Sequence, residues 1–489
     1  MQGQRGDALI CTTCSQVYPS VGGVRLCVAN PQRALASRWR ALAEQRRGLT
    51  ASKAKLSEAA TPGRSRAALA LAERGLDGQL ANLSVIERAM APAAEYLSTR
   101  TRVSDPFADF STSDDSWWSS LNMLPYFYRD WGGTWEAGFL AELFGAAVEE
   151  HGGDRRESVA VLGCGACGLA YEMARLFPAV FGVDFAVDSL LLAKVLLDGG
   201  TVDVRLNFPR AGVPMAQAAV RLQGPQASQA PQAPQAPQEP QPGRGRIELV
   251  VANASRLPFA SGALSCVITQ YLLDLVPSPR TLAAEIHRVL ATGGIWINFS
   301  TLSEKSSPPV VRAYDPLDSL DPASFLERSG FVPLRQAMHR YVHLDQSALS
   351  EWAMTATHTP ILSVARKDGS PSPPVDYFAD YFAGRTGAIL SMVPRFSSYV
   401  GLIEERTHGV DGSGERQLVA VFDRENRRPV GREGAAAAAW LLRQIDGQRT
   451  TAEILAALQR EHGDAGQAGA FLELLRELQE CELIAFRSA

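Results

Sequence analysis

The spacing of apolar residues divides the chain into regions with different periods. Residues 31–150 carry apolar side chains at helical intervals, as in PQRALASRWRALAEQRR, and this pattern predicts a helical region. From residue 157 to residue 367, short apolar runs alternate with amphipathic stretches. This alternation predicts mostly parallel strands joined by helices that cover both faces of one sheet. We therefore expect a doubly wound, Rossmann-like α/β fold in the middle of the chain.

The C-terminal block, residues 395–489, has the pattern of a small α+β domain. The segment QLVAVFDRENRRPV predicts a hairpin with its turn near Asn426, and three helices follow. Thr450 and Glu453 have the spacing of a capping box at the start of the second helix. The third helix carries an apolar face made by Phe471, Leu474, Leu475 and Leu478.

Two stretches interrupt these regions. Residues 223–246 are rich in Pro, Gln and Ala, which cannot bury a core, so we expect a disordered insertion there. Residues 368–394 begin with a Pro/Ser-rich run and are expected to link the central domain to the C-terminal block. A short Cys-bearing piece at residues 8–30 precedes the helical region.

A glycine-rich turn is the main candidate for chemistry. A buried strand at 159–162 leads into Gly163, Gly165 and Gly168, which form G-x-G-x-x-G. Glycines allow a sharp turn and a close ligand approach, and the helix that follows presents free backbone N–H groups. Asp184 ends the next strand, about 20 residues on, where a carboxylate can accept both hydroxyls of a ribose. The pattern favours a ribose-bearing ligand and leaves NAD and S-adenosylmethionine open.

The same turn admits two other interpretations. Leu169, Met173 and Leu176 recur at helical spacing, so the glycines could serve only to pack this helix on the strands. Cys164 and Cys167 form a C-x-x-C inside the turn, which could indicate redox or metal chemistry. Small side chains are also what fits beneath a close backbone, and we expect that to be their role.

Composition and charge exclude several classes of protein. The chain has 489 residues, 46% of them hydrophobic, which is enough for about two to four domains with cores. A formal net charge of −4 gives no general attraction to nucleic acid or to anionic membranes. The N-terminal residues lack the features of a secretory signal, and no apolar stretch approaches bilayer length. Seven cysteines are too few for a disulfide framework, so we expect a cytoplasmic protein.

The central region, above all its segment after the insertion, resembles class I S-adenosylmethionine-dependent methyltransferases. The resemblance runs from Val159 to about Arg366 and includes a loop at 253–255 before LPF and a Gly-Gly turn at 293–294. It implies that the three glycines lie under the methionine part of the cofactor and that Asp184 holds the ribose. Asn253 replaces the usual aspartate, and its carbonyl oxygen can still accept a hydrogen bond from the adenine amino group.

A narrower resemblance is to the carnosine N-methyltransferase family, through FYRDW, YLLD and GGIWINFSTL. It implies that Arg129 contacts the cofactor carboxylate, that Trp131 packs nearby and that Asp274 faces the methyl acceptor. The sequence departs from that family at 356–358, where Ala-Thr-His replaces a tyrosine cluster, and it lacks a histidine expected after GGIWIN. Carnosine is therefore not the expected acceptor. The alternatives are that FYRDW only covers the sheet and that Asp274 only caps a helix.

The two ends resemble other known modules. Cys11 and Cys14 form C-x-x-C before VYPSVGGV, which resembles half of a zinc ribbon that accompanies several methyltransferases. Structural zinc needs four ligands, and Cys27 is the one further candidate, so zinc is possible but we favour a ribbon without metal.

The run LLRQIDGQRTTAEILAALQ resembles the PqqD-like peptide-binding domain, a small winged-helix fold. That likeness implies a precursor-peptide partner that adds as a strand to the edge of a sheet. A packing or dimerisation module is the alternative. DNA binding is less favoured because the block has no clear basic face.

Together these observations predict an S-adenosylmethionine-dependent methyltransferase that N-methylates a peptide, with histidine imidazole as a candidate acceptor. In-line methyl transfer mainly requires alignment of the nucleophile and exclusion of water. Two alternatives stay open. One is a small-molecule N-methyltransferase whose C-terminal domain serves assembly, and the other is a non-catalytic scaffold of a peptide-modifying complex. We expect no nucleic-acid or membrane partner.

Overall fold

The computed structural model describes most of the chain, and all structural statements below concern that part. The described residues are 4–5, 8–11, 17–58, 66–99, 120–153, 156–210, 213–225, 244–273, 275–276, 279–301, 322–349, 356–368, 388–396, 401–408, 414–421, 427–432, 436–462, 467–480 and 484–488. Among them, no helix is long and apolar enough to cross a membrane.

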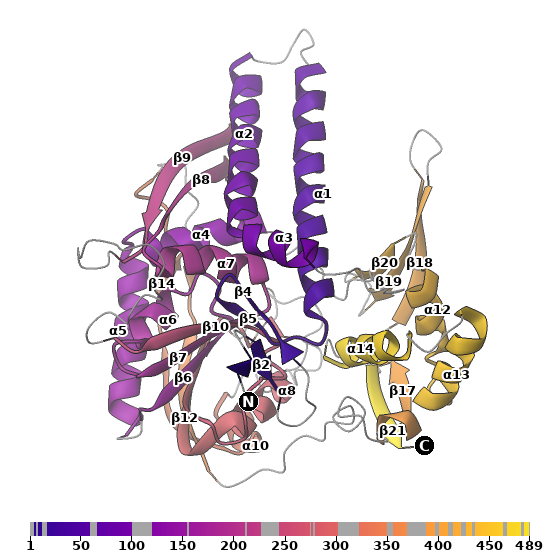
Figure 1. Cartoon of the computed structure of the whole chain (residues 1–489). Coiled ribbons are helices and arrows are strands. Elements are labelled where there is room, and N and C mark those ends of the chain that lie inside the picture. The colour runs from indigo at the N-terminus through magenta and orange to yellow at the C-terminus, as the bar shows by residue number, and fades with distance from the viewer. Residues whose placement is uncertain are drawn as a thin grey trace.

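A nine-stranded sheet forms the centre of the molecule (Figure 1). Its strand order is β13-β16-β12-β11-β6-β7-β10-β5-β4. The strands from β5 to β12 in this order run parallel, whereas β4, β16 and β13 are antiparallel to their neighbours. The strands are β4 (Ser20–Val21), β5 (Val24–Leu26), β6 (Ser158–Leu162), β7 (Ala179–Asp184), β10 (Arg246–Val251), β11 (Leu264–Gln270), β12 (Leu290–Ser300), β13 (Phe331–Met338) and β16 (Ile361–Lys367).

Both faces of this sheet are buried, as the alternation of β6 shows. Val159 and Val161 belong to one hydrophobic cluster, while Ala160 and Leu162 belong to another. Since successive residues of a strand point to opposite faces, the sheet has a core on each side. Helices α4 (Ser120–Trp131), α5 (Trp135–His151), α6 (Gly168–Met173) and α7 (Val187–Leu197) cover one face, and α8 (Pro279–Val289) and α10 (Pro322–Arg328) cover the other. The predicted doubly wound α/β fold is confirmed.

The N-terminal segment extends the same sheet. β1 (Gln4–Arg5), β2 (Ala8–Ile10) and β3 (Val17–Tyr18) form a small antiparallel sheet, and β4 and β5 follow as a hairpin. β5 pairs in parallel with β10, from Leu249 opposite Val24 to Val251 opposite Leu26. Val24 and Leu26 are buried, so the Cys-bearing piece shares the core of the central domain.

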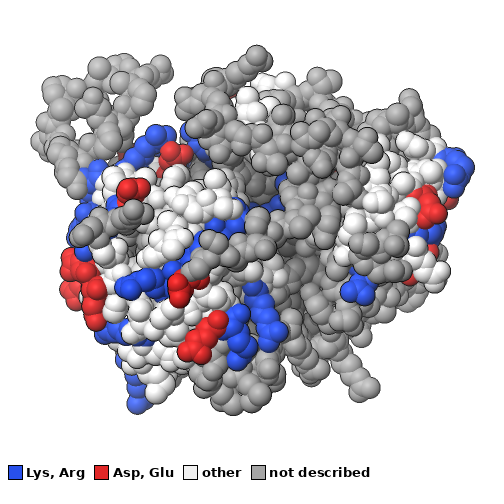
Figure 2. Space-filling view, turned by 90° about the horizontal axis from the view of Figure 1, so that it is seen from below, with Lys and Arg blue, Asp and Glu red and all other residues white. Residues whose placement is uncertain are grey.

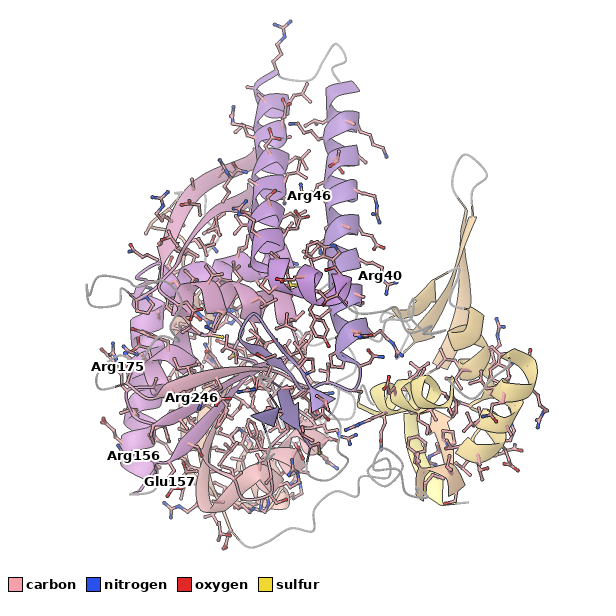
Figure 3. All side chains as sticks on the ribbon, viewed as in Figure 1. Arg40, Arg46, Arg156, Glu157, Arg175 and Arg246 are labelled. Atoms are coloured by element: carbon pink, nitrogen blue, oxygen red, sulfur yellow. The ribbon has the colours of Figure 1, made fainter. Side chains whose placement is uncertain are left out.

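A long helical hairpin rises from the sheet (Figure 1). It consists of α1 (Pro31–Glu58) and α2 (Arg66–Ala89), and the short α3 (Ala91–Ser98) follows. Arg46 reaches from α1 to α2 and donates to both carboxylate oxygens of Glu87, at 2.8 and 2.6 Å (Figure 3). The helical character predicted for this region is confirmed for its described residues.

A β-hairpin packs beside α2, and the sequence reasoning missed it. β8 (Thr201–Arg210) pairs with β9 (Val213–Gln223), and both contact α2. Val202, Val204 and Leu206 alternate along β8 and are buried. This period of two was the available signal for a strand. The expected insertion at 223–246 overlaps the end of β9 and the start of β10, and its residues 226–243 lie outside the described residues.

The face at the amino ends of the parallel strands is polar and mixed in charge. Arg156 and Glu157, which precede β6, and Arg246, which begins β10, are labelled on the side of the molecule away from the α1–α2 hairpin (Figure 3). Viewed from that side, Lys and Arg are interspersed with Asp and Glu (Figure 2). This mixture does not resemble the uniform basic surface that nucleic-acid binding uses.

The C-terminal unit has its own core. Its strands are β17 (Met392–Phe396), β18 (Gly401–His408), β19 (Gly414–Val421), β20 (Arg427–Arg432) and β21 (Ile484–Ser488), and its helices are α12 (Ala436–Gln444), α13 (Thr451–His462) and α14 (Gln467–Glu480), with a 3₁₀ turn at Ala388–Ser391. β17 pairs with β21, and β18, β19 and β20 form a separate antiparallel sheet. Phe471, Leu474, Leu475 and Leu478 are fully buried, which confirms the predicted apolar face.

The motif around Asp446 stabilises this unit locally. The Thr450 backbone N–H donates to Glu453 Oε2 at 2.7 Å and the Glu453 N–H donates to Thr450 Oγ1 at 3.3 Å, which confirms the capping box. Asp446 accepts from the backbone N–H groups of Gln448 and Arg449, and these bonds lower its pKa to about 2. The predicted hairpin is confirmed as the β19–β20 pair, and Asn426 lies outside the described residues.

A buried ion pair fixes the helical hairpin to the central domain. Arg38 of α1 donates from Nε and Nη2 to the two carboxylate oxygens of Asp188 in α7, at 2.8 and 2.9 Å. The Arg38 side chain is 8% exposed and that of Asp188 is 0% exposed. Water therefore screens the pair little, and its bidentate geometry sets the position of α1 relative to α7.

We predict that Asp188→Asn lowers the free energy of unfolding by about 3–5 kcal/mol, because it removes the carboxylate that balances the buried charge of Arg38. The matched control is Asp203→Asn in β8, since both side chains of the Asp203–Arg221 pair are exposed. Urea denaturation followed by circular dichroism measures both variants. Equal stability of Asp188→Asn and the wild type would contradict this assignment.

Candidate functional site

The glycine turn joins β6 to α6 in the predicted place. Gly163 and Gly165 have φ of +65° and +50°, a region that favours glycine. The Cys164 N–H donates to the Val183 carbonyl at 3.2 Å, which holds the turn beside the end of β7. α6 ends at Met173, so the helix is shorter than the spacing of Leu176 predicted.

Asp184 lies where the sequence placed it, at the carboxyl end of β7 and against the turn. Its Oδ2 accepts the Gly165 N–H at 2.8 Å, and its Oδ1 accepts the Ala186 N–H at 2.9 Å. Burial raises the pKa of Asp184, while these two backbone bonds lower it. The next residue, Phe185, is 51% exposed, which is unusual for a large apolar side chain.

The loop after β10 is held by two charged side chains of α8. The Leu257 N–H donates to Glu285 Oε1 at 2.6 Å, and Arg288 Nη2 donates to the Leu257 carbonyl at 3.1 Å. Asn253 begins this loop, and its Oδ1 accepts the Ser255 N–H at 2.8 Å. A carbonyl oxygen has a second lone pair, so the predicted contact of Asn253 with adenine stays a prediction.

Helix α4 is bonded to the turn through two consecutive residues. Asp130 Oδ2 accepts the Gly168 N–H at 2.9 Å, and Trp131 Nε1 donates to the Ala166 carbonyl at 2.8 Å. A Cβ at Gly168 would lie 2.5 Å from the Cβ of Asp130, so the third glycine is required for this close approach. The FYRDW segment therefore does more than cover the sheet, because it fixes the glycine turn.

Arg129, the residue of helix α4 that precedes Asp130, is also buried. Its Nε donates to Asp130 Oδ1 at 2.7 Å, and its Cζ lies 5.3 Å from the centre of the Tyr126 ring. Burial lowers the pKa of Arg129, but the charge and hydrogen bond of Asp130 raise it more, so the net pKa lies above its ordinary value. The guanidinium stays charged beside the turn, as a partner for a carboxylate ligand must.

Comparison with known proteins adds to this geometry. Residues 213–298 match the methyltransferase domain family. The chain is 39% identical over 69 residues to an uncharacterised chloroplastic methyltransferase of Arabidopsis thaliana, and 41% identical over 56 residues to a second one. These segments are 14% and 12% of this chain and 20% and 16% of the relatives. The chain thus matches a fifth or less of the length of these relatives.

Solved structures also resemble the chain. A SAM-dependent methyltransferase of Methanosarcina mazei has a TM-score of 0.29 and 15% identity, over 45% of this chain and 96% of that one. Geranyl diphosphate C-methyltransferase of Streptomyces coelicolor, in complex with S-adenosyl-L-homocysteine, has a TM-score of 0.30 and 14% identity, over 47% of this chain and 76% of that one. Residues 213–298 thus match a methyltransferase domain, and they lie within a central sheet of doubly wound strand order.

The residues at the glycine turn of this methyltransferase domain fit the cofactor. The turn offers a close backbone at Gly163 and Gly165, a carboxylate at Asp184 and a charged guanidinium at Arg129. These groups have the chemistry needed to bind the amino acid part and the ribose of S-adenosylmethionine. The individual contacts of the three glycines, Asp184, Asn253 and Arg129 with the cofactor stay predictions.

The C-x-x-C of the methyltransferase turn is packed rather than exposed. Cys164 and Cys167 are buried, with their sulfur atoms 3.4 Å apart. Burial raises the pKa of the Cys164 thiol well above its usual value, and the hydrogen bond to Cys167 raises it further. A Cβ at Gly182 would lie 3.3 Å from the Cys164 sulfur, which leaves little room beneath the turn. These contacts support the packing interpretation of the pair.

Two predicted residues lie outside the described residues, namely Asp274 and Cys14. Tyr271 and Leu272, shortly before Asp274, are described at the carboxyl end of β11. Cys11 and Cys27 are both partly buried, and burial raises the pKa of Cys27 to about 12. No group of three or more metal-ligating side chains occurs among the residues that the structure describes.

The sequence reasoning missed Glu136 and His343, which the fold brings together. Glu136 lies in the first turn of α5 and is 0% exposed. His343 ends β14 (Tyr341–His343), which pairs with β15 (Ala356–His358). Their side chains are 3.1 Å apart across 207 residues of sequence. The FYRDW resemblance pointed to the neighbouring helix, but no local pattern marked either residue.

We predict that Cys27, Cys164, Cys167 and Cys266 resist alkylation in the folded protein at about pH 8, because the thiolate is the reactive form and all four are protected by packing or a raised pKa. Iodoacetamide labelling followed by peptide mass spectrometry measures this, with the urea-unfolded chain as control. Labelling of the 164–167 peptide as fast in the folded as in the unfolded chain would contradict burial of the pair.

Proposed function

We propose that this chain transfers a methyl group from S-adenosylmethionine to a nitrogen atom of a peptide. The observation that carries the methyl-transfer part is the glycine turn of a methyltransferase sheet, hydrogen-bonded to Asp184 and clamped by Asp130 and Trp131. The cofactor supplies an activated methyl group on a sulfonium. The residues of this chain bind it, orient it and keep water away.

Each part of the turn has a task in this proposal. Asp184 holds the ribose, the backbone at Gly163 and Gly165 supports the methionine part, and Arg129 holds its carboxylate. Asn253 accepts from the adenine amino group. Asp274 accepts the N–H of an acceptor ring and stabilises the cation that forms when the other nitrogen is methylated.

The C-terminal unit supports a peptide acceptor. Among the described residues, β17 and β21 pair only with each other, so each has an outer edge there that a peptide strand can join through backbone hydrogen bonds. Its packed helices keep this edge in place, and Thr451 Oγ1 of α13 donates to the Met392 carbonyl at 2.9 Å. Asn30, directly before α1, donates to Glu473 of α14 at 2.9 Å, which links the unit to the central domain.

We expect Asp184→Asn to weaken binding of S-adenosylhomocysteine about 10- to 100-fold, the loss expected when a hydrogen bond to a charged group is weakened. Isothermal titration calorimetry measures the affinity. Asp203→Asn, on the distant β8–β9 hairpin, is the control and should bind as the wild type does. A folded wild-type protein that binds no S-adenosylhomocysteine would rule out methyl transfer.

Delivery of a peptide by the C-terminal unit can be tested separately from cofactor binding. A precursor peptide encoded beside the gene should be methylated with a low KM, and its isolated leader segment, added in excess, should inhibit competitively. The same leader should leave methylation of the core segment alone unaffected, because only the full peptide uses the C-terminal unit. Radiolabelled methyl transfer measures both rates. Equal KM for the full peptide and the core segment would contradict delivery by this unit.

A further inference from the structure

A cluster of polar and aromatic side chains lies beside the cofactor turn. We name Glu136, Tyr271, Tyr341 and His343 the His343 cluster. The Tyr271 and Tyr341 hydroxyls are 2.8 Å apart, and Tyr341 Oη lies 3.2 Å from His343 Nδ1. The Tyr271 and His343 rings have their centres 4.8 Å apart. One carboxylate, one imidazole and two phenols thus form a connected group, and a second imidazole, that of His358, lies beside it with its ring centre 4.6 Å from that of His343.

The hydrogen bond that Glu136 accepts sets the proton position on His343. Glu136 Oε1 lies 3.1 Å from His343 Nδ1, and Glu136 Oε2 is buried with no partner among the described residues. An ionised carboxylate can only accept hydrogen bonds, so Nδ1 carries the hydrogen. In the neutral ring, Nε2 then carries the lone pair and can accept a proton. A carboxylate placed in this way also stabilises the imidazolium that results.

The cluster touches both sides of the site proposed for methyl transfer. On the cofactor side, the Tyr126 ring lies 5.9 Å from His343 and 5.3 Å from the Arg129 guanidinium carbon. On the strand side, Tyr271 directly follows β11, and the next residue, Leu272, would lie 3.1 Å from a Cβ at Gly163. His343 therefore lies between the residue predicted to hold the cofactor carboxylate and the strand end that leads to Asp274.

Glu136 has its hydrogen-bond partner inside the cluster, although its charge also raises the pKa of Arg129. Arg129 is already balanced by Asp130, whereas the charge of Glu136 has His343 as its hydrogen-bond partner. A fully buried carboxylate is costly unless a partner compensates it. The aromatic rings of the two tyrosines and of Tyr126 add surfaces that favour a cation. The arrangement suits a nitrogen base that arrives protonated.

We propose that His343, oriented by Glu136, removes the proton from the acceptor nitrogen before methyl transfer. This inference rests on the proposed function and assigns the acceptor class as a protonated nitrogen base, either an ammonium or an imidazolium. His343 is the catalytic residue of this step, while Glu136 and Tyr341 are positioning residues. Asp274 keeps the orienting role proposed above.

The proposed step transfers one proton and then one methyl group. The N–H bond of the acceptor breaks, its electron pair stays on nitrogen, and the proton moves to His343 Nε2. The freed pair then forms the bond to the methyl carbon, and the bond from that carbon to sulfur breaks with its pair left on sulfur. The acceptor leaves as the methylated cation, and His343 returns its proton to water.

Two probes separate the possible acceptors, namely N-acetyllysine methylamide and N-acetylhistidine methylamide, each assayed with radiolabelled S-adenosylmethionine. Base catalysis contributes about 10²- to 10⁴-fold, so His343→Gln should lower kcat for the lysine probe by that factor. For the histidine probe, the loss should be smaller at about pH 8, where free imidazole is mostly neutral and needs no base. Methylation of one probe and not the other identifies the source of the nitrogen.

The remaining variants separate catalysis from structure. Glu136→Gln should lower kcat more than it raises KM, and Tyr341→Phe should do so less. Glu142→Gln, an exposed change on the same helix α5, is the matched control and should match the wild type. Calorimetry with S-adenosylhomocysteine should give the same affinity for all four variants, which shows that each is folded.

Two results would overturn the inference. One is full kcat and an unchanged pH profile in His343→Gln. The other is methylation of neither probe by a wild-type chain that binds S-adenosylhomocysteine. Because cofactor binding is measured separately, a chain that binds no S-adenosylhomocysteine rejects the proposed function, whereas the two results above reject only the role of His343.

Discussion

The carboxylate of Asp130 connects helix α4 to the glycine turn, the two parts of the proposed cofactor site. One oxygen accepts from Arg129 and the other accepts the Gly168 backbone N–H, so a single side chain joins helix α4 to the glycine turn. The same contact holds the buried guanidinium of Arg129 next to the turn. The α4–α5 connection, capped by Thr134, then places Glu136 close to His343. The residues proposed to bind the cofactor and the acceptor thus depend on how helix α4 packs on the glycine turn.

The sheet supplies the rigidity behind that contact. Residues of β6 face cores on both sides, and β5 adds a further parallel strand from the N-terminal segment. The Arg38–Asp188 pair, shielded from water, fixes the helical hairpin to α7, whose chain begins shortly after Asp184. β5 and Arg38 therefore belong structurally to the central domain, although both precede Gly163 by more than a hundred residues.

Sequence reasoning recovered the features that are local. The strand, the three glycines and Asp184 lie within one strand–helix–strand unit, and the capping box at Thr450 and Glu453 spans four residues. In both cases the interacting residues are close in sequence, so their spacing alone was enough to predict the feature. The FYRDW segment was located by resemblance, and the structure explains it through the bonds of Asp130 and Trp131.

Contacts between distant segments were not accessible in this way. The β8–β9 hairpin was overlooked because it precedes a Pro/Gln-rich stretch, although its alternating apolar residues were a usable signal. Glu136 and His343 meet only because α5 and β14 pack together, and neither residue lies in a motif. A single sequence without related sequences cannot show such a pairing, since nothing in the spacing along the chain connects the two residues.

The claim that helix α4 and the glycine turn form one cofactor site is tested most directly at Gly168. An added Cβ there would lie 2.5 Å from Asp130 Cβ, whereas a Cβ at Gly138 would meet no atom within 4 Å. Calorimetric titration with S-adenosylhomocysteine should show that Gly168→Ala binds about tenfold or more weakly, a loss of about 1.4 kcal/mol, and that Gly138→Ala binds as the wild type does. Wild-type affinity in Gly168→Ala would contradict the account.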